Sequence, residues 1–419
     1  MIETKFKETE LGPIPEDWKI GVYADFLSKF SAGSTPYRGN LSNFVGDIPW
    51  LSSGELNYCL IEDSIEHISE EAKKTSHLTL HPAGTFLMAI TGLEAPGTRG
   101  RCAILKNPCT TNQSCLAIYP TESMITDYLY WFYRQWSELF GLQHSQGSKQ
   151  QSFTARMVEK LPIYAPSIEE QKEISSTLYA IDAYIHELEK LISKKRDVLQ
   201  GSRQQLLSAK TRLKGYSKKW IDIQIGNIGK TYTGLSGKTK SNFGHGEGKY
   251  ITFLNVLNNS EIDISKLEQV EISIDEKQNQ VKVGDLFFNT SSETPEEVGM
   301  CSTLSIESPN TFLNSFCFGF RITHPGVDSL FLTYLFRSDI GRRLMSYLAK
   351  GVTRYNLSKS EFKSSLLRIP SSIEEQKEIS EILSSMEMEI AELEAKLEKY
   401  KAVRDGMMQQ LLTGKIRLI

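Results

Sequence analysis

The sequence lacks the features by which several classes of protein are identified. Its 419 residues include only six cysteines, without a CxxC pair or a histidine-rich segment, so neither a zinc site nor a disulfide framework is expected. No apolar run approaches the ~20 residues that a membrane-spanning helix needs. The start, MIETKFKETE, has no apolar stretch like that of a secretory signal. The cysteine pattern makes a reducing cytoplasm the expected location.

Sequence motifs of catalysis are also lacking. The seven histidines show no HExxH or other metal-ligand spacing, and GHGEG at 244–248, without the spacing of a phosphate loop, is predicted to be a turn. NPC at 107–109 is not the [ND]PP[FY] motif of amino-methyltransferases. Glu170-Gln171-Lys172 matches the E-x-K pattern of nucleases, but its place at a predicted helix start favours a capping role. We therefore predict a binding or organising protein without a catalytic, metal or cofactor site.

What the chain does have is an internal repeat. The nonapeptide SIEEQKEIS occurs at 167–175 and again, unchanged, at 372–380. Other segments correspond at nearly the same offset: QQLLS with QQLLT, GSKQQSFT (147–154) with GVTRYNLS (351–358), and Trp18 with Trp220. The chain is therefore two copies of one unit of roughly 200 residues, each with a divergent front and a preserved rear.

The rear of each unit is predicted to be a long helix. An N-cap serine and a glutamate three residues later predict a capping box at Ser167 and Glu170, and at Ser372 and Glu375. Apolar residues then recur in steps of four and three for more than four heptads, which is typical of a coiled coil. Gly201 and Gly406 occupy equivalent positions and fit either a kink or fraying, or a close approach of two helices.

Charge is distributed unevenly along the chain. Of the net charge of −3, the helical segments 167–203 and 372–405 carry −1 and −5, which leaves +3 on the remainder. Mildly basic fronts are compatible with contacts to phosphate. The acidity of the helices fits either the solvated face of a coiled coil or the docking of a basic protein.

The fronts are predicted to be mixed domains with a β-rich core. Short apolar runs separated by Gly, Pro, Asn and Ser are typical of strands joined by turns. The predicted strands are DIPWLSS, GTFLMAIT, CAILKN, SCLAIYP, KYITFLN, DLFFNTS and FCFGFRIT, and the predicted helices are TDYLYWFYRQWSELFG and SLFLTYLFRSDIGRRLMSYL.

The predicted fold class is α+β, with two such domains separated by two long coiled-coil helices. The internal repeat implies a pseudo-two-fold axis, and an axis perpendicular to the helix pair makes the helices antiparallel. The predicted boundaries are 1–166 and 214–371 for the two front domains, 167–213 for the first helix, and 372–419 for the second helix with its tail.

This set of motifs resembles the specificity subunit of type I restriction-modification enzymes, and the resemblance spans the whole chain. It is carried by LGPIPEDWK at 11–19, the G-x-x-Q-x-x-[FI]-[ST] block at 147–154, its copy at 351–358 with Arg354 in place of Gln, the paired SIEEQKEIS and the terminal QQLLTGKIRL. It implies that each front is a target recognition domain that reads half of a split double-stranded DNA target, and that the helices form a spacer. Because the fronts diverge, the target should be asymmetric.

The resemblance also implies partners. Two modification (methyltransferase) subunits would dock on this chain, and restriction (nuclease-translocase) subunits would join them. Adenosylmethionine and ATP would belong to those partners, so this chain would not itself be an enzyme. Helices of ~50 Å would place the half-sites on the order of 10–15 base pairs apart. The rival interpretations are a coiled-coil scaffold without a DNA function and a nuclease-methyltransferase fusion.

Residues that read bases are expected among polar side chains on loops that can reach a groove. The candidates are Arg99 and Arg101 in GLEAPGTRGR, Lys149 and Gln150 in GSKQQS, Thr353, Arg354 and Asn356 in GVTRYN, and Arg38, Lys238 and Lys240 in early Gly/Ser-rich loops. For each of them the alternative is a solvated surface residue. The counterpart of GLEAPGTRGR in the second front, SSETPEEVGM, is acidic. Trp131, Phe132 and Trp136 are predicted to be core residues rather than base-stacking ones.

Overall fold

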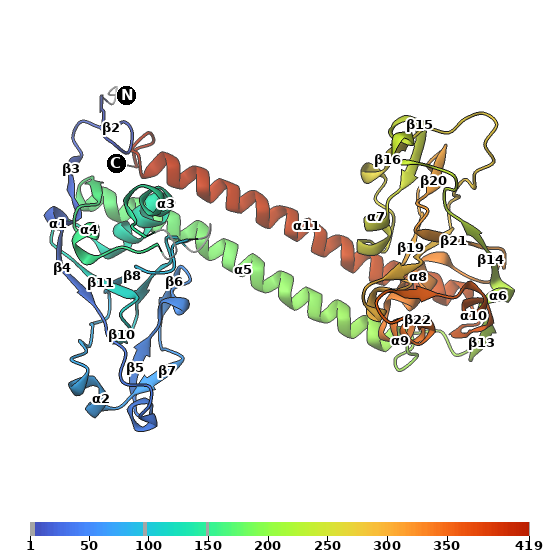
Figure 1. The fold of residues 1–419 in the computed structure, drawn as a ribbon, viewed down its shortest axis with the longest axis horizontal. Coiled ribbons are helices and arrows are strands. Elements are labelled where there is room, and N and C mark those ends of the chain that lie inside the picture. Colours follow the sequence, from blue (N-terminus) through green and yellow to red (C-terminus); the bar gives the residue numbers. More distant parts are fainter. Residues whose placement is uncertain (1–4, 95–98, 148–150, 419) are drawn as a thin grey trace. The chain divides into compact units, whose positions relative to one another are not determined.

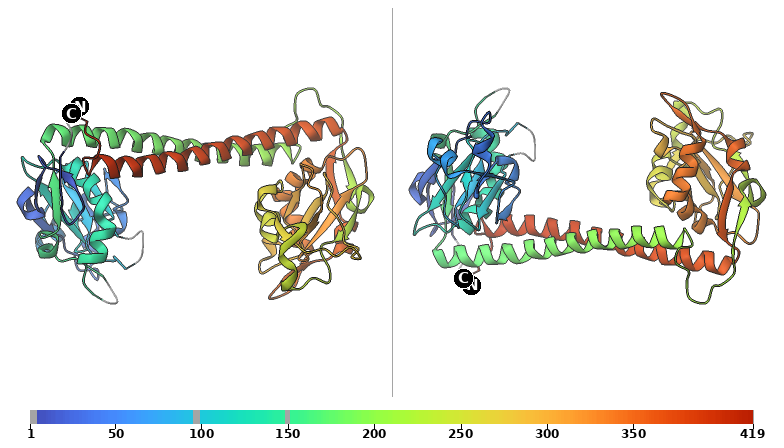
Figure 2. Two further views of the ribbon diagram at one scale, coloured as in Figure 1. Left: turned by 90° about the horizontal axis from the view of Figure 1, so that it is seen from above. Right: turned by 90° about the horizontal axis from the view of Figure 1, so that it is seen from below.

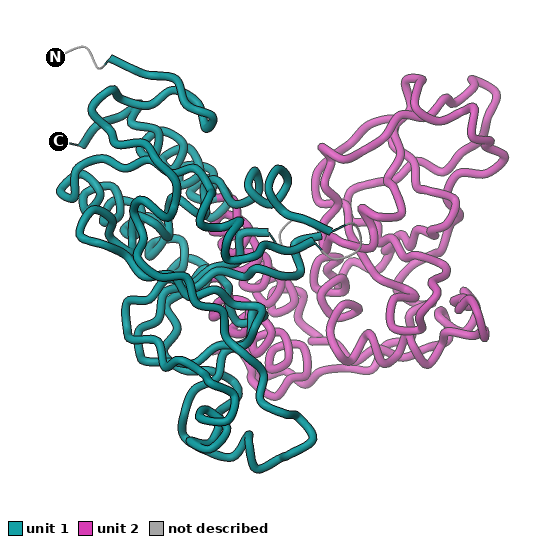
Figure 3. The backbone as a smooth tube through the Cα atoms, turned by 60° about the vertical axis from the view of Figure 1, so that its left-hand side comes forward, with its two compact units in different colours: residues 1–189, 396–419 teal, residues 190–395 magenta. Residues whose placement is uncertain are grey.

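The computed structural model describes residues 5–94, 99–147 and 151–418 (Figure 1). The chain divides into two compact units, the first made of residues 1–189 and 396–419 and the second of residues 190–395 (Figure 3). Helices α5 (Ile168–Leu206) and α11 (Ile373–Leu411) each have 39 residues and contribute a part to both units.

The first unit is built on a five-stranded sheet of order β4-β11-β8-β9-β6. Its strands are β4 (Leu27–Ala32), β6 (Cys59–Ile61), β8 (Phe86–Ala89), β9 (Cys102–Leu105) and β11 (Cys115–Pro120). Both faces of β8 are buried: Phe86 and Met88 join the cluster that includes helix α3 (Thr126–His144), while Leu87 and Ala89 join a second cluster. Burial on both faces explains why these strands are continuous apolar runs.

Smaller elements complete the first unit. A three-stranded sheet has the order β10-β5-β7, and two-stranded pairs join β1 to β2 and β12 to β3. The elements are β1 (Phe6–Lys7), β2 (Ile14–Pro15), β3 (Lys19–Val22), α1 (Tyr23–Phe26), β5 (Ile48–Leu51), β7 (Glu66–Ile68), α2 (Glu70–Thr75), β10 (Thr110–Thr111), α4 (Ala155–Val158) and β12 (Pro162–Ala165).

The second unit repeats this plan with different details. Its sheets have the orders β14-β21-β17-β19, β16-β15-β20 and β18-β23-β22, and β13 pairs with β24. The strands are β13 (Trp220–Gln224), β14 (Gly229–Thr233), β15 (Phe243–Ile251), β16 (Glu268–Val270), β17 (Leu286–Asn289), β18 (Ser291–Ser292), β19 (Cys301–Thr303), β20 (Thr311–Leu313), β21 (Cys317–Ile322), β22 (Ala349–Lys350), β23 (Tyr355–Leu357) and β24 (Leu366–Pro370). The helices are α6 (Ile225–Ile228), α7 (Phe253–Asn258), α8 (Ser329–Arg337), α9 (Asp339–Leu348) and α10 (Lys359–Ser364).

Three sequence predictions need correction in the second unit. The segment KYITFLN is a strand only to Ile251, because the Thr252 hydroxyl accepts a hydrogen bond from the Asn255 N–H and starts helix α7. The glycines of GHGEG form no turn between elements but lie within β15, as an irregularity between Phe243 and Gly248. The predicted helix 329–348 is two helices, because Ser338 ends α8 and its hydroxyl caps α9.

The two long helices run antiparallel in each unit, as predicted (Figures 1 and 2). In the first unit Asp182 pairs with Arg404 and Glu189 with Lys401; in the second, Arg196 pairs with Glu394 and Arg203 with Glu387. Much of the predicted apolar seam is buried, at Ile174, Leu178, Ile185, Leu188, Ile192, Leu199, Leu206, Ile379, Leu383, Ile390 and Leu411. Neither Gly201 nor Gly406 has an atom within reach of an added Cβ, so the close-approach interpretation of these glycines is wrong.

The repeated nonapeptide begins each helix, but its glutamate does not close a capping box. The serine hydroxyls act as N-caps, since Ser167 Oγ accepts from the Glu170 N–H at 3.2 Å and Ser372 Oγ from the Glu375 N–H at 3.4 Å. Both glutamates are fully buried, and each carboxylate accepts two hydrogen bonds from one guanidinium instead. Arg417 donates to Glu170 at 2.5 and 2.7 Å, and Arg212 donates to Glu375 at 2.6 and 2.7 Å.

These arginines belong to equivalent places in the repeat, in the segment that follows the opposite helix. Each ion pair therefore fastens the start of one long helix to the end of the other within a single unit. Removing the arginine would lower the free energy of unfolding, because the carboxylate would stay buried without a partner to offset the cost of its desolvation. This requirement explains why the glutamate is the same in both copies.

Candidate nucleic-acid interface

In the first unit the structure brings together two of the candidate segments, GLEAPGTRGR and GSKQQS, and in the second it brings together their counterparts, SSETPEEVGM and GVTRYN. In the first unit they meet where β8 ends: the Phe153 N–H donates to the Ile90 carbonyl at 2.8 Å, and the Gln151 N–H donates to the Glu94 carboxylate at 3.0 Å. A third segment joins them, since the Ile90 N–H donates to the Ser114 carbonyl at 2.9 Å.

The second unit has the same construction where β17 ends. The Leu357 N–H donates to the Thr290 carbonyl at 2.9 Å, and the Thr290 N–H donates to the Phe316 carbonyl at 2.9 Å. Strand β18 then pairs with β23, so that Ser291 lies opposite Asn356. We call these places the strand-end surfaces: residues 90–94, 99–101, 112–114, 145–147 and 151–153 in the first unit, and 290–300, 314–316 and 349–357 in the second.

The strand-end surface of the second unit exposes the predicted candidates. Thr353, Arg354 and Asn356 are all exposed, and the Arg354 side chain makes one hydrogen bond, from Nε to Ser291 Oγ at 3.2 Å. Its terminal guanidinium nitrogens have no hydrogen bond to another described residue. Lys350 is exposed beside them and pairs with Glu361. A fork of donors on an exposed loop is the arrangement by which arginine reads guanine or holds phosphate.

Helix α9 adds residues to this surface that the sequence prediction missed. Ile340, Arg343 and Tyr347 are exposed and follow one helical face at a spacing of three and four residues. Tyr347 is 84% exposed and Val352, in the adjoining loop, is 90% exposed. The spacing of these three residues could have predicted an exposed helical face. It does so only if a separate helix is assumed to start after Ser338, where α8 ends.

The acidic loop of the second unit is held against α9 by a half-buried arginine. Arg342 donates to the carbonyl oxygens of Gly299 at 3.0 Å and Glu296 at 2.6 Å. Burial, followed by the nearby charge of Arg337, lowers the pKa of Arg342 to about 10. Glu297 accepts a hydrogen bond from Ser292 Oγ at 2.8 Å, so this acidic loop is an ordered part of the surface.

In the first unit, the two arginines of the corresponding loop have different surroundings. Arg99 is only 8% exposed and donates to Glu138 Oε1 at 2.5 Å and to the Glu94 carbonyl at 3.0 Å. Arg101 is partly exposed; its carbonyl accepts from the Ala89 N–H at 2.9 Å, but its side chain has no hydrogen bond or ion pair with the residues that the structure describes. Lys149 and Gln150 lie outside the described residues.

The remaining candidates lie away from the strand ends. Arg38 forms a two-bonded ion pair with Glu66, at 2.5 and 2.7 Å, and its guanidinium stacks over Phe44. The Lys238 side chain is 4% exposed and pairs with Glu276 at 2.6 Å. Lys240 is exposed at the start of a short 3₁₀ turn, without an ion pair to another described residue.

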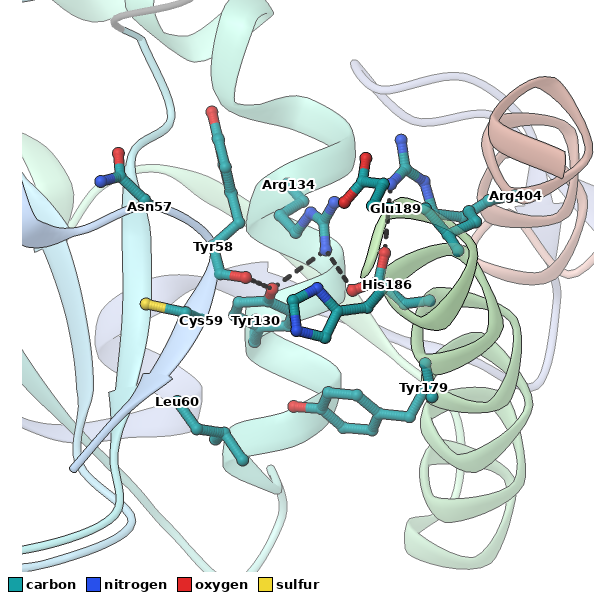
Figure 4. A pocket seen from close by; sticks show the side chains of 13 residues that line it. Asn57, Tyr58, Cys59, Leu60, Tyr130, Arg134, Tyr179, His186, Glu189 and Arg404 are labelled. Atoms are coloured by element: carbon teal, nitrogen blue, oxygen red, sulfur yellow. Dashed lines mark hydrogen bonds and ion pairs between the residues drawn. The ribbon is translucent and has the colours of Figure 1, made fainter. Parts of the chain in front are cut away.

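A cavity of about 670 Å³ with a mixed polar and apolar lining lies between the first front domain and the long helices (Figure 4). Tyr58 and Arg134 line it from the front domain, His186 and Glu189 from α5, and Arg404 from α11. Both arginines in its lining have partners. Arg134 donates to Tyr130 Oη at 2.9 Å and lies over the Trp131 ring, and Arg404 forms an ion pair with Asp182. These pairings make the charged side chains structural contacts of the cavity wall rather than a set of reacting groups.

Other chemistry is limited within the part of the chain that the structure describes. Burial raises the pKa of the Cys109, Cys301 and Cys317 thiols to about 12, which keeps these thiols protonated and unreactive. No group of three or more His, Cys, Asp or Glu side chains that could hold a metal ion occurs among the described residues. None of the described helices combines the length and the apolar character that crossing a membrane requires.

Comparisons with known proteins agree with this arrangement. The family model described as "Type I restriction modification DNA specificity domain" matches twice, at residues 15–195 and 217–400. The chain is 33% identical over 192 residues to the type I restriction enzyme MjaIX specificity subunit of Methanocaldococcus jannaschii, a match that covers 45% of this chain and 43% of that protein. This match therefore spans less than half of that relative's own length.

Two further similarities extend over nearly the whole chain. The putative type I restriction enzyme MjaX specificity subunit of the same archaeon is 22% identical, with 99% of this chain and 97% of that protein covered. The crystal structure of the type I restriction-modification system S subunit from M. genitalium has a TM-score of 0.60 at 14% identity, and covers 97% of this chain and 98% of that one. With two copies of the matching domain over most of its length, the chain belongs to the family of type I restriction modification DNA specificity proteins.

Proposed function

We propose that this chain is the DNA-recognition subunit of a type I restriction-modification complex, in which each front domain reads one half of an asymmetric two-part DNA target. The observation that carries the proposal is the strand-end surface. The same backbone hydrogen bonds build it in both units, whereas the exposed side chains differ. A constant frame that presents variable side chains is what sequence recognition requires, since backbone contacts position a protein and base contacts specify the sequence.

We assign roles to the described candidate residues from their exposure, and to Lys149 and Gln150 from their place in the GSKQQS segment alone. Direct contacts to DNA are proposed for Arg101, Lys149, Gln150, Lys240, Thr353, Arg354 and Asn356. Arg343 and Tyr347 of α9 join them, since an exposed cation suits phosphate and an exposed ring can pack against bases or sugars. For Arg38, Arg99 and Lys238 we propose an indirect role, because their charged ends are paired within their own unit.

The partners proposed are double-stranded DNA, two methyltransferase subunits, and restriction subunits that act as nuclease and translocase. The duplication supports two methyltransferase subunits, because a repeated unit offers two equivalent docking surfaces. On this proposal the chain positions chemistry that its partners perform, in the cytoplasm, and adenosylmethionine and ATP bind to those partners.

The experiment is to express the chain with its methyltransferase subunit in a host that lacks both, and to map modified adenines by single-molecule sequencing. We expect one split motif whose two halves differ in sequence. Expression of the methyltransferase alone is the control and should leave the genome unmodified. Modification of a continuous motif, or of none, would contradict the proposal.

A further inference from the structure

Each long helix carries a second set of equivalent residues besides the apolar seam. They lie on the face that touches the front domain, and they form what we call the polar row. Its members are Gln171, Tyr179 and Asp182 on α5 in the first unit, and Gln376, Ser380, Ser384 and Glu387 on α11 in the second. Glutamine and acid are 11 residues apart in both rows, which is about three turns or roughly 16 Å along one helical face.

The glutamines fasten the helix start to the front domain. Gln171 is fully buried, donates from Nε2 to the Ser123 carbonyl at 2.9 Å and accepts at Oε1 from the Ile125 N–H at 3.0 Å. Gln376 does the same, since it donates to the Gly326 carbonyl at 3.0 Å and accepts from the Asp328 N–H at 2.9 Å. In each case one amide bridges the segment that leads into the next helix of the front domain.

The acids make the second attachment, three turns further on. Asp182 lies 3.6 Å from Arg134 of α3 and accepts from Arg404 of α11 at 3.1 Å. Glu387 accepts from Ser260 Oγ at 2.6 Å and from Tyr334 Oη at 2.9 Å, and pairs with Arg203 of α5. Each acid therefore joins the front domain to both long helices at once.

The residues between these two points add hydrogen bonds to the front domain. In the first unit Tyr179 donates to Asp127 at 2.9 Å, and its ring stacks on Tyr130 with an interplanar angle of 15°. In the second, Ser380 donates to Asp328 at 3.2 Å and Ser384 to Glu261 at 3.1 Å. A front domain attached to its helix at one point could rotate about that point, whereas attachment at two points along one helical face fixes the orientation of the domain on the helix.

We propose that Gln171, Asp182, Gln376 and Glu387 are positioning residues that fix each recognition domain on its helix and thereby restrict the complex to one spacer length between the DNA half-sites. The inference rests on the proposed function. It concerns spacing only, because no residue of the polar row belongs to a strand-end surface. Loosening a row should leave the sequence of both half-sites unchanged.

The chain offers closely matched variants for the test. Asp182→Asn and Glu387→Gln remove the charge that joins the domain to both helices, and Gln171→Met and Gln376→Met remove the bridging amides at similar volume. Glu189→Gln and Glu394→Gln are the controls, because these carboxylates pair with Lys401 and Arg196 on the opposite helix. All variants are expressed with the methyltransferase subunit, and modified adenines are mapped by sequencing.

We expect the row variants to modify sites whose spacer is one base pair longer or shorter, with unchanged half-sites. The ratio of these sites to those of native spacing should rise at least about tenfold, a change equivalent to about 1.4 kcal/mol. The controls should keep the native spacing. A purely structural role predicts less modification at native sites without new spacings, and that result would overturn the proposal.

Two outcomes need separate treatment. If the Asp182→Asn complex does not assemble, Tyr179→Phe replaces it, because this change loses one hydrogen bond and keeps the ring stack; unchanged spacing there counts against the proposal. If the unaltered chain directs no split motif at all, the proposed function fails. If it does so and every row variant keeps the native spacing, only the positioning role fails.

Discussion

Single residues of one type serve different purposes in the two units, and their surroundings decide which. Arg99 is buried against Glu138, which lies 39 positions away in the sequence, whereas Arg354 is exposed on a loop. The sequence placed both in candidate loops, because loop composition is visible in a sequence and the pairing of an arginine with a distant carboxylate is not. The prediction that Trp131 and Phe132 are core residues is confirmed, because both are fully buried.

The first prediction concerns Arg354. Arg354→Ala should weaken binding of the assembled complex to its target by about 1–3 kcal/mol and reduce the salt dependence of affinity. Folding should change little, because the residue is exposed and loses one hydrogen bond to Ser291. Arg368→Ala, at an exposed position of β24, is the control. A salt titration of DNA affinity that is the same for both variants would remove Arg354 from the interface.

The second prediction concerns His81, which is 1% exposed and makes a hydrogen bond to Tyr119 Oη at 2.7 Å. Burial, and secondly the charge of Lys29, lower the pKa of His81 from 6.5 to about 4. Between these values the unfolded chain binds a proton that the folded chain does not. The free energy of unfolding should therefore fall as the pH drops from about 6.5 to about 4.

Urea unfolding across this pH range tests the His81 prediction. The loss of stability on acidification should be smaller in His81→Gln, which cannot titrate. Equal slopes for the His81 variant and the unaltered chain would show that this imidazole does not set the acid sensitivity.

At the scale of elements, sequence periodicity predicted which helices and strands exist better than it predicted where each of them begins and ends. The two long helices and all seven predicted strands are present, although KYITFLN turns into a helix midway. The capping box illustrates the limit. Local sequence contains Ser and Glu at the required spacing, but Glu170 and Glu375 bind arginines that arrive from the end of the opposite helix. Tertiary contacts of this kind override a local pattern and leave no signal near it.

The third prediction belongs to these helix starts. Arg212→Ala leaves the Glu375 carboxylate buried without its two hydrogen bonds and should lower the free energy of unfolding by about 3 kcal/mol. Lys210→Ala, two residues away and exposed, should change it by less than about 0.5 kcal/mol. Urea unfolding followed by circular dichroism measures both, and similar stability of the two variants would contradict a structural role for the ion pair.

At the scale of the whole molecule, the repeat is the feature that the sequence predicted most directly. Both copies of SIEEQKEIS start a 39-residue helix, and in each copy the cap serine, the paired glutamate and the buried glutamine hold the helix start in place. The division into front domains and helices at 166, 213 and 371 stays a prediction, because the compact units cut across both helices. No local pattern marks such a division, since it depends on which parts of each helix contact which domain.

The most direct test of the central claim is an exchange of one front domain. Residues 1–166 would be replaced by the front of another family member with a known target, and modified adenines would be mapped with the same methyltransferase subunit. We predict that one half of the split motif changes to that of the donor while the other half is retained. A change in both halves, or in neither, would contradict the assignment of one half-site to each front domain.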